Sequence, residues 1–121
     1  MSRTWTADTC WQKARELVIA RDLTCRRCHR EGSDVHHIFR RSIHALRYHP
    51  VNLILLCRFC HRWAHDYKTL FRAWVEGQIN GEEGGWEALQ AMSRWEWKDK
   101  KSREWFQDFH PRAEAIIKRF S

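Results

Sequence analysis

The residues best suited to chemistry are four cysteines and four histidines that lie close together in the first half of the chain. The cysteines form two Cys-x-x-Cys pairs, Cys25/Cys28 and Cys57/Cys60. Because each such pair presents two sulfurs to one ion, the spacing predicts a tetrahedral zinc cage. Four sulfurs fill the coordination sphere, so this zinc is predicted to be structural rather than catalytic. Unpaired core cysteines and an iron-sulfur site are the alternatives.

The histidines next to the cysteines are His36, His37, His61 and His65. Neighbours on a strand point to opposite faces, so only one of His36 and His37 can readily aim at a given metal. His61 and His65 are four apart and share one face of a helix. Three imidazoles on one divalent ion would leave coordination sites open for Lewis-acid catalysis, and the fourth histidine can act as general base. The alternative is that these histidines are merely polar surface.

Hydrophobic periodicity predicts the elements that must position these groups. A capping box at Thr9 and Gln12 starts a helix that ends near Asp22. Short strands are predicted at 35–39 and 51–56, with a basic loop between them. A further helix is predicted from Phe59 through Leu70 or beyond. The apolar positions of the two helices are Trp11, Ala14, Leu17 and Val18, then Trp63, Tyr67, Leu70 and Trp74.

The second half of the chain differs in composition. Four of the five glycines fall within residues 77–85, which predicts a linker or turn at 76–85 between a first domain at 1–75 and an extension at 86–121. The extension is predicted to be helical, with a last helix that begins at Pro111. Its apolar face would comprise Ala113, Ile116, Ile117 and Phe120. Tryptophans of this extension either pack in its core, stack on bases at Trp95 or Trp97, or meet a protein partner.

Charge predicts the class of partner. The net charge is +7, and residues 1–65 hold 12 Lys/Arg against 5 Asp/Glu whereas residues 66–121 hold 10 against 10. A basic surface around the histidines favours polyanions, chiefly nucleic acid, and a solvated basic face is the alternative. No apolar run approaches the length of a membrane span, the start lacks a secretion signal, and thiol pairs suit a reducing interior. A cytoplasmic protein without membrane contact is therefore expected.

Three segments carry a resemblance to a known family: DVHHI, Asn52 within VNLILLC, and CHRWAH. They resemble HNH nucleases, whose ββα-metal core is also called the His-Me finger. The intervals agree with those of colicin-like members, since His37 to Asn52 is 15 residues and Asn52 to His61 is nine. The resemblance spans about residues 10–70. It implies an α+β fold in which the ββα-metal core is stapled by the four-cysteine zinc, with an N-terminal helix and a helical, tryptophan-rich C-terminal extension.

The resemblance also implies an activity and the residues that carry it. His37 would activate water and Asn52 would constrain the loop and orient that histidine, with His61 as the third catalytic residue. His36, His61 and His65 would hold one catalytic divalent ion, which could be magnesium, manganese, nickel or zinc. The reaction implied is hydrolysis of DNA, by nicking or double-strand cleavage, to 5′-phosphate and 3′-hydroxyl ends. Arginines that could clamp phosphates are Arg40, Arg41, Arg47, Arg58 and Arg62.

The four-cysteine variant, with HHIFRRS and CHRWAH, looks like small bacteriophage-encoded HNH proteins, and this resemblance implies a role in phage or mobile-element DNA processing. Two other readings stay open. One is a zinc-stabilised nucleic-acid-binding module that does not cleave. The other is a phage adaptor that binds a protein partner through the tryptophan-rich extension.

Overall fold

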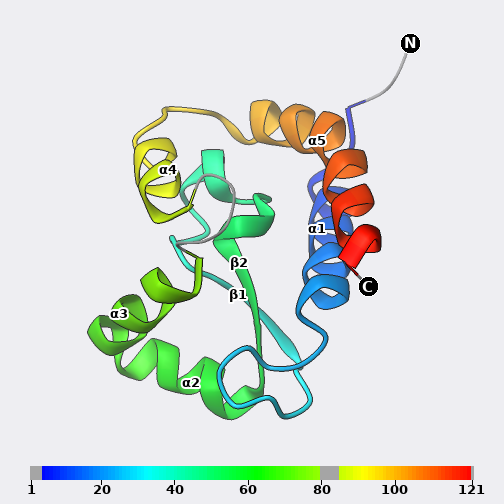
Figure 1. The fold of residues 1–121 in the computed structure, drawn as a ribbon. Coiled ribbons are helices and arrows are strands. Elements are labelled where there is room, and N and C mark those ends of the chain that lie inside the picture. Colours follow the sequence, from blue (N-terminus) through cyan, green and yellow to red (C-terminus); the bar gives the residue numbers. More distant parts are fainter. Residues whose placement is uncertain (1–3, 80–84, 121) are drawn as a thin grey trace.

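Two short antiparallel strands lie between two groups of helices in the computed structural model, which describes residues 4–79 and 85–120 and the side chains of 4–79 and 85–115. Figure 1 labels the helices and strands. In chain order the elements are α1 (Ala7–Asp22), β1 (Asp34–His37), η1 (His44–Leu46), η2 (Pro50–Asn52), β2 (Leu53–Leu56), α2 (Arg58–Asp66), α3 (Lys68–Ile79), α4 (Gly85–Met92) and α5 (Asp99–Phe120), where η is a short 3₁₀ turn. The predicted α+β fold is confirmed, and β1, β2 and α2 form its ββα unit.

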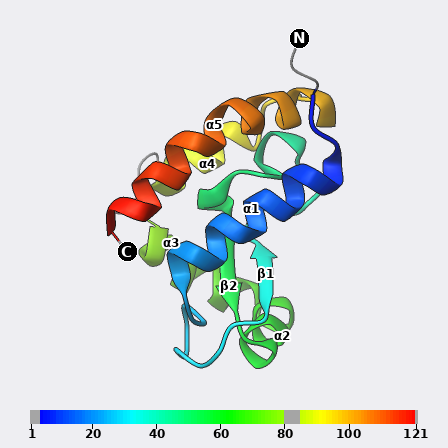
Figure 2. The ribbon, with the colours of Figure 1, turned by 90° about the vertical axis from the view of Figure 1, so that its right-hand side faces the viewer.

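The sheet separates the core into two clusters. Strands β1 and β2 pair so that Asp34 faces Leu56 and His37 faces Leu53. Because side chains alternate along a strand, Leu53 and Leu55 pack with α1 and α5, whereas Ile54 and Leu56 pack with α2, α3 and α4. Figure 2 shows α1 crossing one side of the strands with α5 beside it. The two histidines at the end of β1 therefore belong to different faces.

The N-cap of helix α1 lies three residues before the predicted cap. Thr6 is the N-cap, and its hydroxyl accepts a hydrogen bond from the backbone N–H of Thr9 at 3.2 Å. The capping box predicted at Thr9 is therefore wrong, because Thr9 lies within the first turn and Thr6 supplies the same hydroxyl chemistry. The predicted end near Asp22 is correct. The buried residues of this helix are Cys10, Ala14, Leu17 and Val18.

The end of α1 satisfies the outer edge of β2. Asp22, whose side chain is 1% exposed, accepts a hydrogen bond from the N–H of Leu55 at 2.9 Å. Arg21 donates to the carbonyl oxygens of Pro50 and Leu53 at 2.7 and 2.6 Å. These bonds occupy backbone groups that a two-stranded sheet would otherwise leave unpaired. The strand that precedes the second cysteine pair is thereby fixed to α1.

The helix predicted to run from Phe59 past Leu70 is interrupted. Tyr67 has φ −124° and ψ 62°, so α2 ends at Asp66 and α3 begins at Lys68. This break changes which side of the later helix is apolar. Tyr67 and Leu70, predicted as core positions, are 56% and 58% exposed. The residues of α3 that are buried are Phe71, Val75 and Ile79.

The C-terminal extension packs on the rest of the chain through α4 and α5. Helix α4 contacts α3 and both 3₁₀ turns, and α5 contacts α1 and η1. Helix α3 continues through Gly77, and residues 80–84 of the predicted linker lie outside the described residues. No helix in the described part of the chain has both the length and the apolar character that a membrane crossing needs.

Pro111 does not start a helix, contrary to the prediction. It lies inside α5, which begins at Asp99. A proline there removes the backbone donor that would reach the carbonyl of Gln107. The ring N–H at Nδ1 of His110 bonds that carbonyl instead, at 2.9 Å, so the helix continues. Ala113 is buried as expected, and the side chains of Ile116, Ile117 and Phe120 lie outside the described residues.

Candidate metal centres and groove

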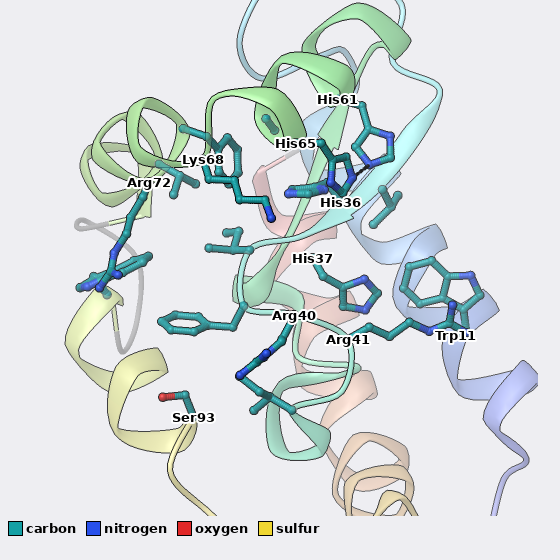
Figure 3. Close-up of a pocket in the computed structure, with 18 residues that line it drawn as sticks. Trp11, His36, His37, Arg40, Arg41, His61, His65, Lys68, Arg72 and Ser93 are labelled. Carbon is teal, nitrogen blue, oxygen red and sulfur yellow. Dashed lines mark hydrogen bonds between the residues drawn. The ribbon is translucent and has the colours of Figure 1, made fainter.

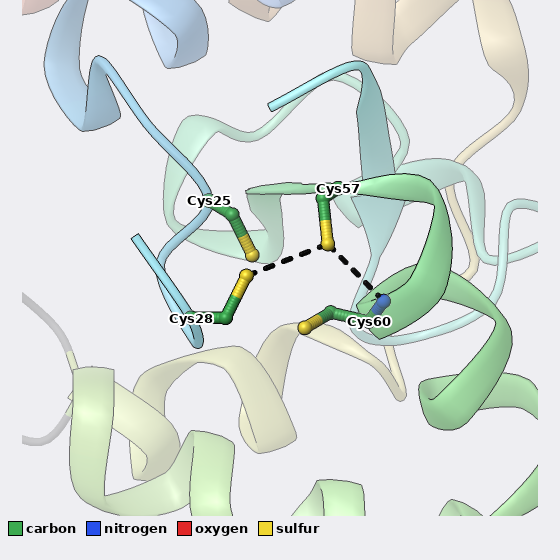
Figure 4. Close-up of side chains that lie close together, drawn as sticks. All are labelled: Cys25, Cys28, Cys57 and Cys60. Atoms are coloured by element: carbon green, nitrogen blue, oxygen red, sulfur yellow. Dashed lines mark hydrogen bonds between the residues drawn. The ribbon is translucent and has the colours of Figure 1, made fainter. Parts of the chain in front are cut away.

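The four paired cysteines converge at one point. Cys25 and Cys28 come from the loop after α1, Cys57 caps the N-terminus of α2, and Cys60 lies in its first turn. Figure 4 shows the four side chains turned toward one another. All four sulfurs lie within 4.8 Å of each other, and the sulfurs of Cys28 and Cys57 are 3.5 Å apart. This is the donor set of a closed zinc cage.

The surroundings of these sulfurs fit a bound cation. Burial raises the pKa of the Cys25 thiol, but backbone N–H groups that point at its sulfur more than offset this, so that the pKa falls to about 6. Burial raises the pKa of Cys60 to about 12. Four thiolates this close would repel one another, and a divalent cation removes that repulsion. The cluster is therefore compatible with structural zinc.

A second cluster is made of imidazoles. His36 comes from β1, and His61 and His65 come from successive turns of α2. Their ligand nitrogens all lie within 4.8 Å of one another, and the Nε2 atoms of His61 and His65 are 3.1 Å apart. Figure 3 shows the three rings gathered at one end of a groove. Burial, aided by the neighbouring histidines, lowers the pKa of His36 to about 3, so this ring stays neutral, as a metal ligand must be.

Asp34 contacts this cluster through His61. It is not among the site residues that the sequence predicts. One of its carboxylate oxygens lies 2.9 Å from Nδ1 of His61. That contact fixes the tautomer, because the carboxylate can only accept and Nδ1 must then carry the hydrogen. Nε2 of His61 then carries a lone pair that can bind a cation. The signal was present in the sequence, since Asp34 is two residues before His36 and shares its face of the strand.

Replacing Asp34 by asparagine should weaken divalent-ion binding by about tenfold to a hundredfold, the usual cost of losing a carboxylate behind a ligand histidine. Titration of manganese or nickel into the protein by calorimetry would measure the change. Asp66→Asn is the matched control, because its partner Arg62 is a surface residue at 3.7 Å. An unchanged isotherm for the Asp34 variant would show that Asp34 does not orient the site.

His37 faces the other way, as strand alternation predicts. Its Nε2 lies 3.0 Å from the backbone carbonyl oxygen of Arg47, and the ring stacks on Trp11 with centroids 5.1 Å and planes 15° apart. A carbonyl only accepts, so Nε2 must carry the hydrogen and Nδ1 keeps its lone pair. Burial lowers the pKa of His37, assisted by the nearby arginine charges, and the ring is neutral at pH 7. A neutral, oriented imidazole with a free lone pair suits a general base.

Asn52 holds the loop between the strands. It is fully buried, and its amide donates to the carbonyl oxygens of Phe39 and Leu46, both at 3.1 Å. Its Oδ1 accepts from the N–H of Phe39 at 2.7 Å. None of these three hydrogen bonds is made to His37. Asn52 therefore fixes the loop backbone at Phe39 and at Leu46. Leu46 is one residue before Arg47, whose carbonyl contacts His37.

A groove of about 1000 Å³ runs from the histidines toward α4. His36, His37, His61 and His65 all line it, and no aspartate or glutamate does so among the described residues. In Figure 3 it continues past Arg40 and Arg41 to Ser93. The charged lysine and arginine side chains that line the groove are all positive, so the surface attracts anions.

Only two of the five predicted phosphate-binding arginines line this groove. They are Arg40 and Arg41, both exposed. Arg47 instead pairs with Asp99 at 2.9 Å. Arg58 and Arg62 lie exposed on α2 and are not among the described residues that line the groove.

Two cations of the groove wall were missed by the sequence analysis. Lys68 and Arg72, on α3, face the groove across from Arg40 (Figure 3). Their spacing continues the series begun by His61 and His65, since positions 61, 65, 68 and 72 recur every three or four residues. That periodicity was the available signal.

Comparison with known proteins agrees with the resemblance noted above. The family model for HNH endonuclease matches residues 25–67. The matched segment includes both cysteine pairs, the three clustered histidines, His37 and Asn52. No curated protein and no solved structure matches the chain.

Proposed function

Because residues 25–67 match the family model for HNH endonuclease, we propose that the protein is a metal-dependent endonuclease that hydrolyses DNA phosphodiester bonds. The observation that carries the proposal is the convergence of His36, His61 and His65 at one end of a cationic groove that also holds His37. That arrangement combines a cation site, a general base and a surface for phosphates.

The proposal assigns two metal sites of different kinds. Cys25, Cys28, Cys57 and Cys60 would hold structural zinc. His36, His61 and His65 would hold a divalent ion, which would supply charge stabilisation at phosphoryl oxygens. Imidazole donors suit zinc, nickel or manganese, and magnesium would have to accept nitrogen ligands. Asp34 would keep the lone pair of His61 on Nε2, where it can bind the ion, because its carboxylate contacts Nδ1.

His37 is assigned the proton transfer. Nδ1 of its neutral ring takes a proton from the water that attacks phosphorus, and in-line displacement leaves 5′-phosphate and 3′-hydroxyl ends. The Arg47 carbonyl and the Trp11 ring hold the imidazole in place. Asn52 keeps the loop closed behind it.

DNA is proposed to follow the groove. Arg40 and Arg41 lie next to His37 on one side, and Lys68 and Arg72 line the other. Each phosphate neutralised by such a side chain releases counterions, which makes binding salt-dependent and largely independent of sequence. We further propose that the substrate is phage or mobile-element DNA and that the chain is divided at 76–85.

Replacing Lys68 by alanine should weaken DNA binding by about threefold to tenfold and reduce the slope of log affinity against log salt by about one. Fluorescence anisotropy with a labelled duplex, without added metal, would measure both quantities. Lys100→Ala is the matched control, because Lys100 pairs with Glu104 on the surface of α5 at 3.9 Å. Equal slopes for the Lys68 variant and the wild type would place the DNA elsewhere.

Cleavage of supercoiled plasmid by the purified protein tests the activity. The assay should be run in magnesium, manganese, nickel and zinc, together with elemental analysis for tightly held zinc. Nicked or linear product is expected with at least one metal. If plasmid stays intact in every metal while DNA is bound, the protein is a zinc-stabilised binding module. If no DNA is bound and a protein partner is captured through the exposed Trp95 region, it is an adaptor.

A further inference from the structure

Asp99, the first residue of α5, lies far outside the segment 25–67 yet bonds to the loop of that segment. One carboxylate oxygen accepts from the guanidinium of Arg47 at 2.9 Å and from the hydroxyl of Tyr48 at 2.8 Å. The other accepts from Arg103 at 2.8 Å. Burial raises the pKa of Asp99, but these three donors more than offset it and hold the pKa below its usual range. The carboxylate is therefore charged and fully engaged.

Arg47 connects the Asp99 carboxylate to His37. Its guanidinium reaches Asp99, while its backbone carbonyl oxygen lies 3.0 Å from Nε2 of His37. The side chain and the carbonyl of one residue thus face in two directions. A movement of Arg47 away from α5 would shift the atom that sets the tautomer and orientation of the His37 ring.

A second contact from α5 holds the same turn. Ser102, 1% exposed, donates through its hydroxyl to the carbonyl oxygen of His44 in η1. On the opposite side Asn52 donates to the carbonyl of Leu46. The turn before Arg47 is thus bonded both by Asn52 of η2 and by Ser102 of the C-terminal helix. Without α5, the turn would lose the bond from Ser102 and keep the bond from Asn52.

We propose that Asp99 is a positioning residue for the general base: it anchors the Arg47 side chain so that the Arg47 carbonyl holds Nε2 of His37. This inference rests on the proposed nuclease function. It gives the C-terminal extension a role in the reaction without contact with substrate. It also reassigns Arg47 from the DNA surface, where the sequence placed it, to the support of His37.

The first test is Asp99→Asn, which keeps the shape and removes the charge. A misplacement of about 1 Å at a catalytic group can lower a rate by about a hundredfold, so we expect kcat for plasmid cleavage to fall about tenfold to a hundredfold. DNA affinity measured without metal should stay within twofold. Glu104→Gln is the matched control on the same helix, because Glu104 pairs with Lys100 at the surface. It should leave kcat unchanged.

A double-mutant cycle separates positioning from a general loss of stability. If Asp99 acts through Arg47, the variants Arg47→Ala and Asp99→Asn should lower kcat by similar factors, and the double variant should be no slower than either. Multiplied losses would overturn the proposal. If Asp99→Asn does not fold, Arg47→Ala and Tyr48→Phe decide the matter, because each removes one donor and leaves Arg103 on the carboxylate. Unchanged kcat in both would then overturn it.

A readout that needs no cleavage distinguishes this inference from the proposed function. In protein labelled with ¹⁵N-histidine, the His37 signals, assigned with His37→Ala, should show hydrogen on Nε2 in the wild type. In Asp99→Asn a mixture of tautomers is expected. A wild type that fails to cleave would refute the nuclease function alone. An Asp99 variant with unchanged tautomer and unchanged rate would refute the positioning role alone.

Discussion

Replacing His37 by alanine is expected to lower the rate of DNA cleavage by about a thousandfold, within the range that a general base contributes. The reason is geometric. His37 lines the groove with its ring fixed between Trp11 and the Arg47 carbonyl, and only its Nδ1 is free to take a proton. Single-turnover cleavage of supercoiled plasmid at saturating protein would measure the loss. DNA affinity and melting temperature should change little.

His65→Ala is the informative contrast for this variant. His65 belongs to the imidazole cluster, so its loss should lower the cleavage rate and the affinity for divalent ions together. His37→Ala should lower the rate and leave the metal isotherm unchanged, because His37 points to the opposite face of β1. If the His37 variant cleaves within threefold of the wild type, another group takes the proton. If it loses metal binding as well, His37 belongs to the cation site.

Both clusters could be predicted because their signals are local. A Cys-x-x-Cys knuckle has its geometry in four residues, and His61 and His65 share a helical face whatever surrounds them. Alternation along a strand likewise separates His36 from His37. That the two distant Cys-x-x-Cys pairs meet in space was also predictable, because four thiolates are needed to fill the coordination sphere of one zinc ion. The fold class followed from the same segments through the resemblance.

The parts that were missed depend on contacts distant in sequence or on one backbone angle. Nothing near Tyr67 marks the break between α2 and α3, so the sequence wrongly predicts Tyr67 and Leu70 as core positions. Proline is favoured at helix starts, so the sequence predicts one at Pro111. The bond from His110 to the carbonyl of Gln107, which Pro111 leaves without a donor, depends on the rotamer of His110 and cannot be seen in the sequence. Arg47 looked like any basic loop residue, since its partner Asp99 is 52 positions away.

Replacing Cys25 by serine is expected to abolish cooperative unfolding of the protein. Binding of structural zinc contributes about 10–16 kcal/mol in small zinc domains, which is comparable to the whole free energy of unfolding of a domain, about 5–15 kcal/mol. Here Cys25, Cys57 and Cys60 are themselves buried members of the core cluster that lies under α2 and α3. Circular dichroism on heating and elemental analysis for zinc would show a broad transition and loss of the bound ion.

Cys10→Ala is the matched control, because Cys10 is equally buried but belongs to the cluster under α1 and lies apart from the cage. It should keep its zinc and melt cooperatively. The cage variant should also lose the second cation site, since Cys57 and Cys60 start the helix that carries His61 and His65. A Cys25 variant that retained zinc and a sharp melt would show that three sulfurs suffice. One that melted sharply without zinc would show that hydrophobic packing alone holds α2 against β1.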